Sequence, residues 1–229
     1  MSVLVVTGTG TEIGKTIVTA AVAAAAAHRR VAVLKPAQTG LAPGEPGDVA
    51  EVARLAGAHV TAVELARFPE PLAPATAARR AGMEPVRPYE VAEAAGKLAA
   101  DHDLVLVEGA GGLLVRFDDE GATLADAARL LAAPVLVVAP AGLGTLNSTA
   151  LTAEALRARE LDCLGVVIGS MPAAPDLAER CNVADLPVAA GSPLLGVVPA
   201  GAGSLAPAEF RARAASWLAA PLGGDRPLG

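Results

Sequence analysis

The sequence predicts a three-layer, doubly wound α/β fold built on a mostly parallel sheet. Six short runs of Val, Leu and Ile recur along the chain, and they are continuously apolar rather than alternating. That pattern is typical of strands that helices cover on both faces. Ala-rich, helix-permissive stretches separate these runs, so strand and helix alternate. The 229 residues contain no linker and no internal repeat, which predicts one domain over residues 1–229.

The elements follow from these runs in chain order. The predicted strands are residues 3–6, 31–34, 104–107, 135–138, 164–168 and 194–198. The predicted helices are residues 15–29, 49–56, 88–100, 124–132, 145–159 and 207–219. A Gly- and Pro-rich segment at residues 41–47 directly follows the second strand, which favours a functional loop over a hinge. We expect the tail after residue 220 to fray.

The composition argues against several classes of protein. With 18 basic and 24 acidic residues the net charge is −6, so a broad basic face for nucleic acid is not expected. Two charge-free stretches, 130–153 and 186–208, are long enough for a membrane span, but prolines and glycines interrupt both. No secretory signal precedes the first strand, so we expect a cytoplasmic protein. The two cysteines lack a C-x-x-C spacing and indicate neither a disulfide framework nor structural zinc.

Residues 7–16, TGTGTEIGKT, join the first strand to an Ala-rich helix and have the pattern of a phosphate loop. In such a loop the backbone N–H groups and the helix dipole bind phosphate oxygens, Lys15 reaches the β and γ phosphates, and Thr16 offers a hydroxyl to Mg2+. Thr9 stands where the strict pattern has glycine, so the loop is a variant. A plain glycine turn before a buried helix is the alternative, but the strand and helix on either side favour a fold of the P-loop NTPase type.

Lysine is scarce, and its positions are therefore informative. The chain has only Lys15, Lys35 and Lys97. Lys35 closes the second predicted strand, where a doubly wound sheet brings it to the same edge as the phosphate loop. A compact ammonium group there favours a role beside a transferred phosphate or a developing oxyanion. The alternative is a lysine that extends from a strand end into solvent.

Two carboxylates are candidates for a magnesium site. Glu108 ends the buried run 104–107 and is followed by glycines, and Asp48 opens the helix after the Gly/Pro segment. In P-loop proteins a carboxylate on a neighbouring strand shares the metal with the loop hydroxyl, because Mg2+ prefers hard oxygen ligands. Glu108 is the first choice. For Asp48, a plain helix N-cap is the alternative.

A third candidate site follows the strand at 135–138. The sequence PAGLGTLN at residues 140–147 leads into a helix whose free N–H groups would suit a carboxylate. A simple Thr or Asn cap explains the same residues equally well.

Four motifs taken together resemble the dethiobiotin synthetase family. They are GTGTEIGKT at 8–16, KPAQTG at 35–40, VEGAGG at 107–112 and LGTLN at 143–147, and their order and spacing match along nearly the whole chain. The resemblance implies a homodimeric enzyme that closes the ureido ring of dethiobiotin from 7,8-diaminononanoate, CO2 and ATP with Mg2+, in biotin synthesis. One amine captures CO2 as a carbamate, the carbamate is phosphorylated, and the second amine closes the ring.

The resemblance also implies roles for single residues. Lys35 would stabilise the carbamate, Lys15 would bridge it to the γ-phosphate, and Thr11 and Thr39 would contact the diamine. Thr16, Asp48 and Glu108 would hold Mg2+. The substrate's distal carboxylate would lie on the helix start of the second subunit, at Leu143, Gly144, Thr145, Leu146 and Asn147. The residues implied for the nucleotide and its metal are Glu12, Ile13, Gly14, Lys15, Thr16, Ile17, Asp48, Glu108, Gly109, Ala110, Gly111, Gly169, Ser170, Val198, Pro199 and Ala200, with Glu12 also a candidate substrate contact.

The chain departs from the family where the base is bound. Family members commonly carry an Asn at each of two strand ends to bind the adenine edge, whereas here the two segments read Gly169-Ser170 and Val198-Pro199-Ala200. We therefore expect weak discrimination among nucleoside triphosphates, because a hydrogen-bonding site is what rejects a wrong base strongly.

Two other functions fit the same fold. A ParA- or MinD-like switch ATPase would carry a signature lysine early in the loop, where this chain has Thr9 and Gly10, and would need a basic stripe or tail. A cobyrinate-type amidotransferase would need a glutaminase domain, for which the chain is too short. We rank both below the dethiobiotin synthetase.

Overall fold

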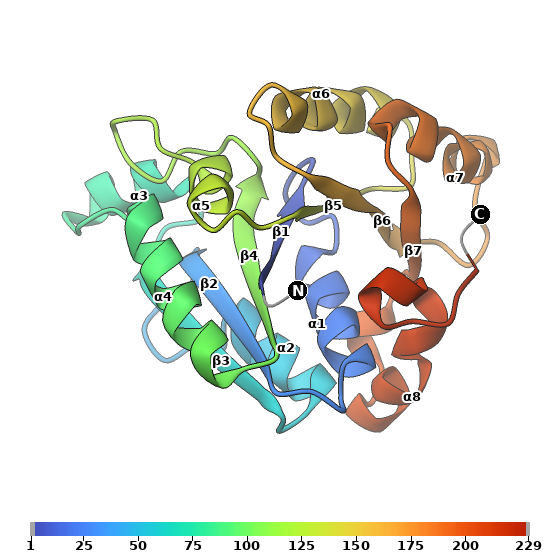
Figure 1. Ribbon diagram of the computed structural model, residues 1–229, viewed down its shortest axis with the longest axis horizontal. Coiled ribbons are helices and arrows are strands. Elements are labelled where there is room, and N and C mark those ends of the chain that lie inside the picture. Colours follow the sequence, from blue (N-terminus) through green and yellow to red (C-terminus); the bar gives the residue numbers. More distant parts are fainter. Residues whose placement is uncertain (1–2, 228–229) are drawn as a thin grey trace.

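The computed structural model describes residues 3–227, and within them a single parallel sheet of seven strands forms the centre of the molecule (Figure 1). The strand order is β3-β2-β4-β1-β5-β6-β7, and every neighbouring pair is parallel. The predicted doubly wound α/β fold is confirmed. The strands are β1 (Val3–Gly8), β2 (Val31–Thr39), β3 (Val60–Phe68), β4 (Leu104–Gly112), β5 (Val135–Ala139), β6 (Cys163–Met171) and β7 (Leu194–Pro199).

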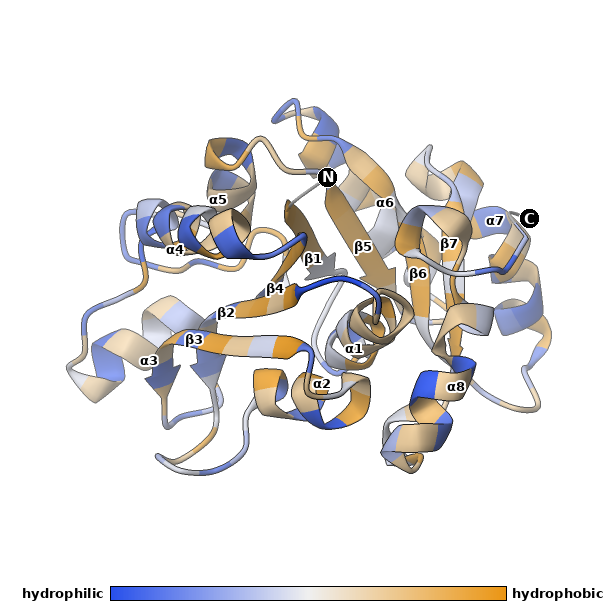
Figure 2. Cartoon of the chain, turned by 60° about the horizontal axis from the view of Figure 1, so that its bottom comes forward, coloured by the Kyte–Doolittle hydropathy of each residue, from blue (hydrophilic) through white to orange (hydrophobic). Residues whose placement is uncertain are grey.

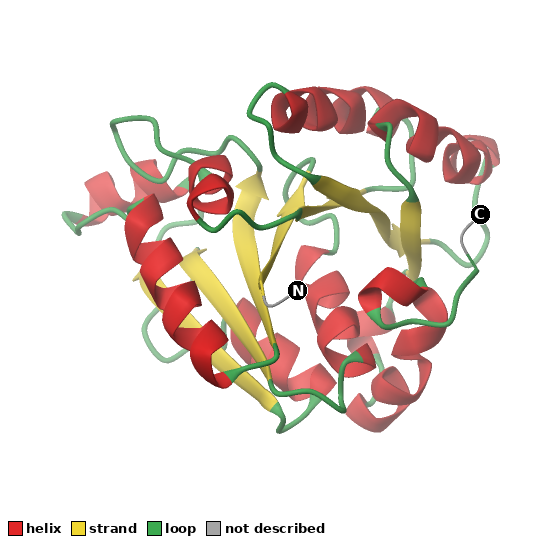
Figure 3. Ribbon diagram, in the orientation of Figure 1, coloured by secondary structure: helices red, strands yellow, loops and turns green. Residues whose placement is uncertain are grey.

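Helices cover both faces of the sheet (Figures 1 and 3). One apolar cluster joins the sheet to α1, α2 and α8, and another joins it to α3, α4, α5, α6 and α7. Figure 2 shows that the strands are hydrophobic along most of their length, whereas the helices carry both hydrophobic and hydrophilic residues. This difference is expected when helices cover a sheet on both faces and expose one side to solvent. The helices are α1 (Lys15–Ala25), α2 (Asp48–Ala56), α3 (Pro74–Ala81), α4 (Pro88–Asp101), α5 (Leu124–Leu130), α6 (Thr145–Arg157), α7 (Leu177–Ala190) and α8 (Pro207–Trp217).

The edge strand β3 was not predicted from the sequence. Its residues, VTAVELARF, mix polar and apolar side chains, and most of them are only partly buried. A search for continuously apolar runs passes over such a strand, because an edge strand needs less apolar cover than a central one. Strand β3 therefore has a mixed polar and apolar sequence, whereas the strands that were predicted contain continuous apolar runs.

Several strands also run further than predicted. The pairing of β2 with β4 ends at Leu34 and Val107, but β2 stays paired with β3 up to Thr39. Pro36 is tolerated there because this part of the strand has a partner on one side only. Lys35 therefore lies inside a strand and not at its end, which corrects the prediction, and Glu108 likewise lies inside β4.

The sequence also missed two helices and misjudged the tail. Neither α3 nor α7 was predicted, and α7 contains an internal proline, Pro187, which argues against a helix in the sequence. The tail does not fray between residues 220 and 227, because the short 3-10 helix η2 (Ala220–Leu222) buries the Leu222 side chain in the core. None of the helices among residues 3–227 has the length and apolarity needed to cross a bilayer.

The position of β1 decides where a ligand can bind. It lies between β4 and β5, and the chain leaves it for opposite edges of the sheet, toward β2 and β3 on one side and β6 and β7 on the other. In open α/β sheets, ligands bind beyond the carboxyl ends of the strands at such a reversal of strand order. The loop after β1 and the ends of β2 and β4 meet there.

Candidate active site

The loop between β1 and α1 has the backbone geometry of an anion cradle. Thr9 N–H donates to the carbonyl of Val138 at 3.0 Å, which ties the loop to β5. Glu12, a non-glycine residue, adopts φ +57°, and Gly14 follows with φ +94° as the N-cap of α1. Successive backbone N–H groups in left-handed and right-handed conformations form a concave anion-binding surface at a helix N-terminus.

Lys15 turns back over this loop. Its Nζ donates to the carbonyl oxygen of Gly10 at 2.7 Å, and the side chain is buried. Burial, together with repulsion from the nearby ammonium of Lys35, lowers the pKa of Lys15 to about 8. Attraction by Glu108 and Asp48 offsets this lowering only in part, so an anion bound beside Lys15 would further favour the charged form of its side chain.

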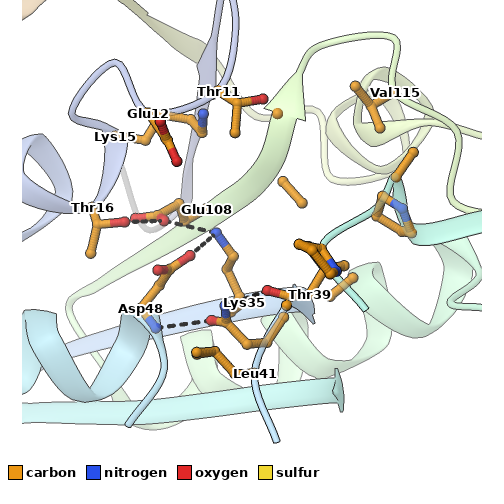
Figure 4. Close-up of a pocket in the computed structure, with 18 of the residues that line it drawn as sticks. Thr11, Glu12, Lys15, Thr16, Lys35, Thr39, Leu41, Asp48, Glu108 and Val115 are labelled. Atoms are coloured by element: carbon orange, nitrogen blue, oxygen red, sulfur yellow. Dashed lines mark hydrogen bonds and ion pairs between the residues drawn. The ribbon is translucent and has the colours of Figure 1, made fainter. Parts of the chain in front are cut away.

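Lys35 is the centre of a buried ion-pair cluster (Figure 4). Its ammonium lies 2.5 Å from Asp48 Oδ2, 2.9 Å from Glu108 Oε1 and 3.0 Å from the carbonyl oxygen of Gly109. Burial alone would lower the pKa of Lys35, but attraction by Glu108 and Asp48 outweighs it and leaves the pKa raised. Lys35 therefore stays charged and is not a lysine that extends into solvent.

Glu108 connects this cluster to the phosphate loop. Its Oε1 accepts a hydrogen bond from the Thr16 hydroxyl at 2.9 Å as well as the bond from Lys35. The other carboxylate oxygen, Oε2, is buried and has no hydrogen-bond partner among the described residues. A buried carboxylate oxygen without a donor is costly unless a cation or a water binds it.

These groups line one cavity of about 780 Å³. Figure 4 shows Lys15 and Lys35 on its wall from different elements, with Thr16, Asp48 and Glu108 near them. The sequence-predicted residues on the wall are Thr11, Glu12, Gly14, Lys15, Thr16, Lys35, Thr39, Asp48, Glu108, Ala110 and Gly111. Gly109 lies behind the wall and contributes the carbonyl that accepts from Lys35.

The residues predicted for the base lie outside this cavity. Gly169 packs on the phosphate loop so closely that a Cβ there would stand 2.0 Å from the carbonyl oxygen of Ile13. Ser170 and Ala200 are exposed at the neighbouring ends of β6 and β7. The two strand ends are joined by a hydrogen bond in which Ala200 N–H donates to the carbonyl oxygen of Met171 at 2.7 Å. The remaining nucleotide-site predictions outside the wall are Val198 and Pro199, at the end of β7, Ile17, which packs against Gly203, and Ile13, which packs against Gly8.

The predicted carboxylate seat is also separate from the cavity of the same chain. Gly144 is the N-cap of α6 with φ +88°, and no side chain among residues 3–227 caps the helix by a hydrogen bond. Leu143 is 89% exposed, and Asn147 is exposed one turn further on. Thr145 is buried with an unpartnered hydroxyl, and Leu146 is half-buried. A single chain does not bring these residues to Lys35.

The structure adds wall residues that the sequence reasoning did not select. They come from β2, from the segments after β2 and β4, and from the loop before α3 and the first residue of that helix; the apolar ones are Ala37, Leu41, Pro71, Leu72, Ala73, Pro74 and Val115. No charge or glycine pattern marks them. Gln38 also lines the cavity, and its side chain is buried. Its place within the KPAQTG motif is the one sequence feature that points to it.

The comparisons with known proteins agree with this geometry. A model of the AAA domain family matches residues 2–207. The ATP-dependent dethiobiotin synthetase BioD of Streptomyces avermitilis is 73% identical over 98% of this chain and 94% of its own length. That of Saccharopolyspora erythraea is 71% identical over 98% of each chain. The chain belongs to the dethiobiotin synthetase family. The resemblance seen in the motifs is thereby confirmed.

Solved structures show the same fold at much lower identity. The MinC:MinD cell division protein complex of Aquifex aeolicus aligns with a TM-score of 0.59 and 14% identity over 93% of this chain and 86% of that one. A ParA family ATPase of Chlorobium tepidum aligns with a TM-score of 0.58 and 13% identity over 92% and 89%. These likenesses concern the fold alone.

The close packing of Gly169 generates the first prediction. In Gly169→Ala the new methyl group would meet the Ile13 carbonyl at 2.0 Å and Val138 Cγ1 at 2.7 Å, so the phosphate loop must shift. We expect ATP affinity to fall and the unfolding free energy to drop by about 1–3 kcal/mol. Calorimetric titration with ATP and thermal unfolding measure both. Gly96→Ala, at a helix position with open space, is the matched control, and equal behaviour of the two variants would refute the argument.

Proposed function

We propose that this protein makes dethiobiotin from 7,8-diaminononanoate, CO2 and ATP, in biotin biosynthesis. What carries the proposal is the pair of buried ammonium groups, Lys15 and Lys35, that line one cavity with two carboxylates beside a phosphate loop. Relatives named dethiobiotin synthetase, 71–73% identical over nearly the whole chain, support it. The need for ATP agrees with a cytoplasmic location.

The proposed reaction proceeds in three bond-forming steps. One amine nitrogen attacks CO2 and loses a proton, which gives a carbamate. A carbamate oxygen then attacks the γ-phosphorus and expels ADP, which gives a carbamic–phosphoric anhydride. The second amine attacks the carbonyl carbon, loses a proton and expels phosphate, which closes the ring. Negative charge collects on carbamate and phosphoryl oxygens, so stabilisation of those oxygens is what the site must supply.

The chain's own residues match these demands. Lys35 would donate to the carbamate, and Lys15 would bridge the carbamate and the γ-phosphate from the phosphate loop. Thr11 and Thr39 lie on the same wall and would position the diamine, with Glu12 as a further contact. Apolar wall residues after β3 and β4 would hold the methylene chain and exclude water.

The residues present also fit Mg2+. Thr16 is hydrogen-bonded to Glu108, and Asp48 and Glu108 share the ammonium of Lys35, so three hard oxygen ligands line the same part of the cavity. The buried Oε2 of Glu108 has no donor among the described residues. These three residues would hold the ion. When bound, it would neutralise phosphate charge. Among the described residues no group of three or more His, Cys, Asp or Glu gathers, so the site would complete its shell with phosphate and water.

A homodimer would complete the substrate site. The helix start at 143–147 presents uncapped N–H groups, and Leu143 is 89% exposed on a loop that does not reach its own cavity. Both features fit a seat for the distal carboxylate of a substrate held by the partner subunit.

One assay tests the function. Purified protein with Mg-ATP, bicarbonate and 7,8-diaminononanoate should yield dethiobiotin, ADP and phosphate in equal amounts, as measured by mass spectrometry and phosphate release. Slow ATP hydrolysis that is indifferent to the diamine would instead support a switch ATPase and sink the proposal.

A substitution of Lys35 tests the role of its ammonium group in the reaction. We expect Lys35→Ala to abolish ring closure while ATP binding stays largely intact, since among the described residues the polar partners of Lys35 are Asp48, Glu108 and Gly109, which lie outside the phosphate loop. The variant leaves Glu108 and Asp48 without their cation, so the unfolding free energy should drop by about 3–5 kcal/mol, and Mg2+ should restore more stability than in the parent. Turnover assays, ATP titration and melting curves with and without Mg2+ measure this. Retained turnover would remove Lys35 from the mechanism.

The residues proposed to lie near the nucleotide base lead us to expect that the enzyme uses several nucleoside triphosphates. The strand ends at Ser170 and Ala200 present no amide side chain to a base, so ATP, CTP and GTP should support rates within about tenfold of each other. Initial rates at matched concentrations test this. A preference for ATP of about a hundredfold would contradict it.

Subunit mixing tests the shared site. Lys35→Ala and Asn147→Glu should each be inactive, the second because it places a carboxylate at the proposed carboxylate seat. Co-expression with two different tags isolates the heterodimer, in which one pocket combines an intact Lys35 with an intact Asn147 from the partner. We expect about half of the parent activity to return, and no recovery would mean that each chain builds its own site.

A further inference from the structure

The loop that carries Asp48 has little to hold it by burial. Residues 41–47, LAPGEPG, connect β2 to α2, and residues 42–46 are all exposed. Such a loop stays mobile unless polar contacts fix it. Yet Asp48, the residue that follows it, has its carboxylate 2.5 Å from the ammonium of Lys35.

Arg67 of the edge strand β3 supplies those contacts. Its Nη1 donates to the carbonyl oxygens of Glu45 at 2.6 Å and Ala42 at 3.2 Å, so that one side chain holds both ends of the exposed turn. Its Nε and Nη2 donate to the two carboxylate oxygens of Glu64 at 3.0 and 2.8 Å. The fork geometry of a guanidinium makes this double engagement specific to arginine.

The same cluster fixes the start of α2. Asp48 N–H donates at 2.9 Å to Oε1 of Gln38, a buried side chain from β2, which takes the place of an N-cap because Gly47 has no side chain. A Cβ on Gly47 would stand 2.3 Å from Glu64 Oε1, 2.8 Å from Arg67 Nη2 and 2.9 Å from Gln38 Oε1. The backbone before Asp48 is therefore packed directly onto the Glu64–Arg67 pair and Gln38.

From these contacts we propose that Arg67, held by Glu64, is a positioning residue that sets the carboxylate of Asp48 for Mg2+ and Lys35. The inference rests on the proposed function for the role of Asp48 and adds a residue that lies outside the cavity wall. We expect Arg67 to touch neither substrate nor metal, because it does not line the cavity. It acts through the backbone of residues 42–47, which would otherwise carry Asp48 through many conformations.

Arg67→Ala tests the inference in two ways. The Mg2+ concentration that gives half-maximal rate should rise by about tenfold, as for other residues that orient a metal ligand. Excess Mg2+ should recover most of the activity, and the KM for ATP at saturating Mg2+ should change little because Arg67 does not contact the phosphate loop. Independently of activity, the amide hydrogens of residues 42–48 should exchange faster with solvent in the resting protein.

Conservative and control variants separate positioning from general stability. Arg67→Lys keeps the charge but loses the fork, so its Mg2+ requirement should lie between those of the parent and Arg67→Ala. Arg129→Ala removes an exposed arginine from a similar i,i+3 pair with Asp126 on α5 and should match the parent in both measurements. Unchanged loop exchange in Arg67→Ala, or lost activity that excess Mg2+ does not recover, would overturn the inference. If the parent protein made no dethiobiotin, the proposed function would be wrong. The hydrogen-exchange measurement would still show whether Arg67 holds the loop at residues 42–47.

Discussion

The site depends on the mutual neutralisation of charges that would each be costly to bury alone. Lys35 and Glu108 are 3% and 1% exposed, and an isolated ion at such a depth loses several kcal/mol of hydration. Their contact, with Asp48 as a second acidic partner, offsets the cost of burying Lys35 and leaves the pKa of its ammonium raised. The parallel register makes this arrangement possible, because Leu34 and Val107 are direct neighbours on β2 and β4, so the next residues on both strands, Lys35 and Glu108, arrive at the same level.

The phosphate loop and the ion-pair cluster are joined by one residue. Glu108 accepts from Thr16 on α1 and from Lys35 on β2, so a single carboxylate oxygen connects the nucleotide side of the cavity to the side where the diamine would lie. The placement follows from topology, since β1 lies next to β4 and β4 next to β2. In a reaction that moves a phosphoryl group onto a carbamate, both sides must be aligned at once, and a rigid sheet edge does this with little reorganisation.

The sequence predicts a residue's position well when the residue lies in or beside a recognisable pattern, and poorly when its position depends on partners that are distant along the chain. The phosphate loop, Lys35 and Glu108 lie in or beside short apolar runs, so pattern and residue chemistry were enough to put them at one edge. Strand β3 lacks such a run, and no sequence pattern marks Arg67, because the carbonyl groups that it binds at Ala42 and Glu45 lie more than twenty residues away along the chain. The buried Leu222 shows the same limit, because only tertiary packing distinguishes it from a frayed tail.

Acidic side chains accompany both lysines on the wall of the cavity. Lys15 and Lys35 carry two formal positive charges, and Glu12, Asp48 and Glu108 carry three formal negative ones, so the wall has no excess of positive charge before a ligand binds. The carbamate and the triphosphate would add several negative charges, and a divalent cation held by the same carboxylates offsets part of them. The carboxylates therefore serve two demands in turn: they keep the lysines charged in the resting protein, and they provide the hard oxygen ligands for the ion that accompanies ATP. A site built from more lysines and fewer acids would bind phosphate, but it would repel that ion and bury unpaired cations between ligands.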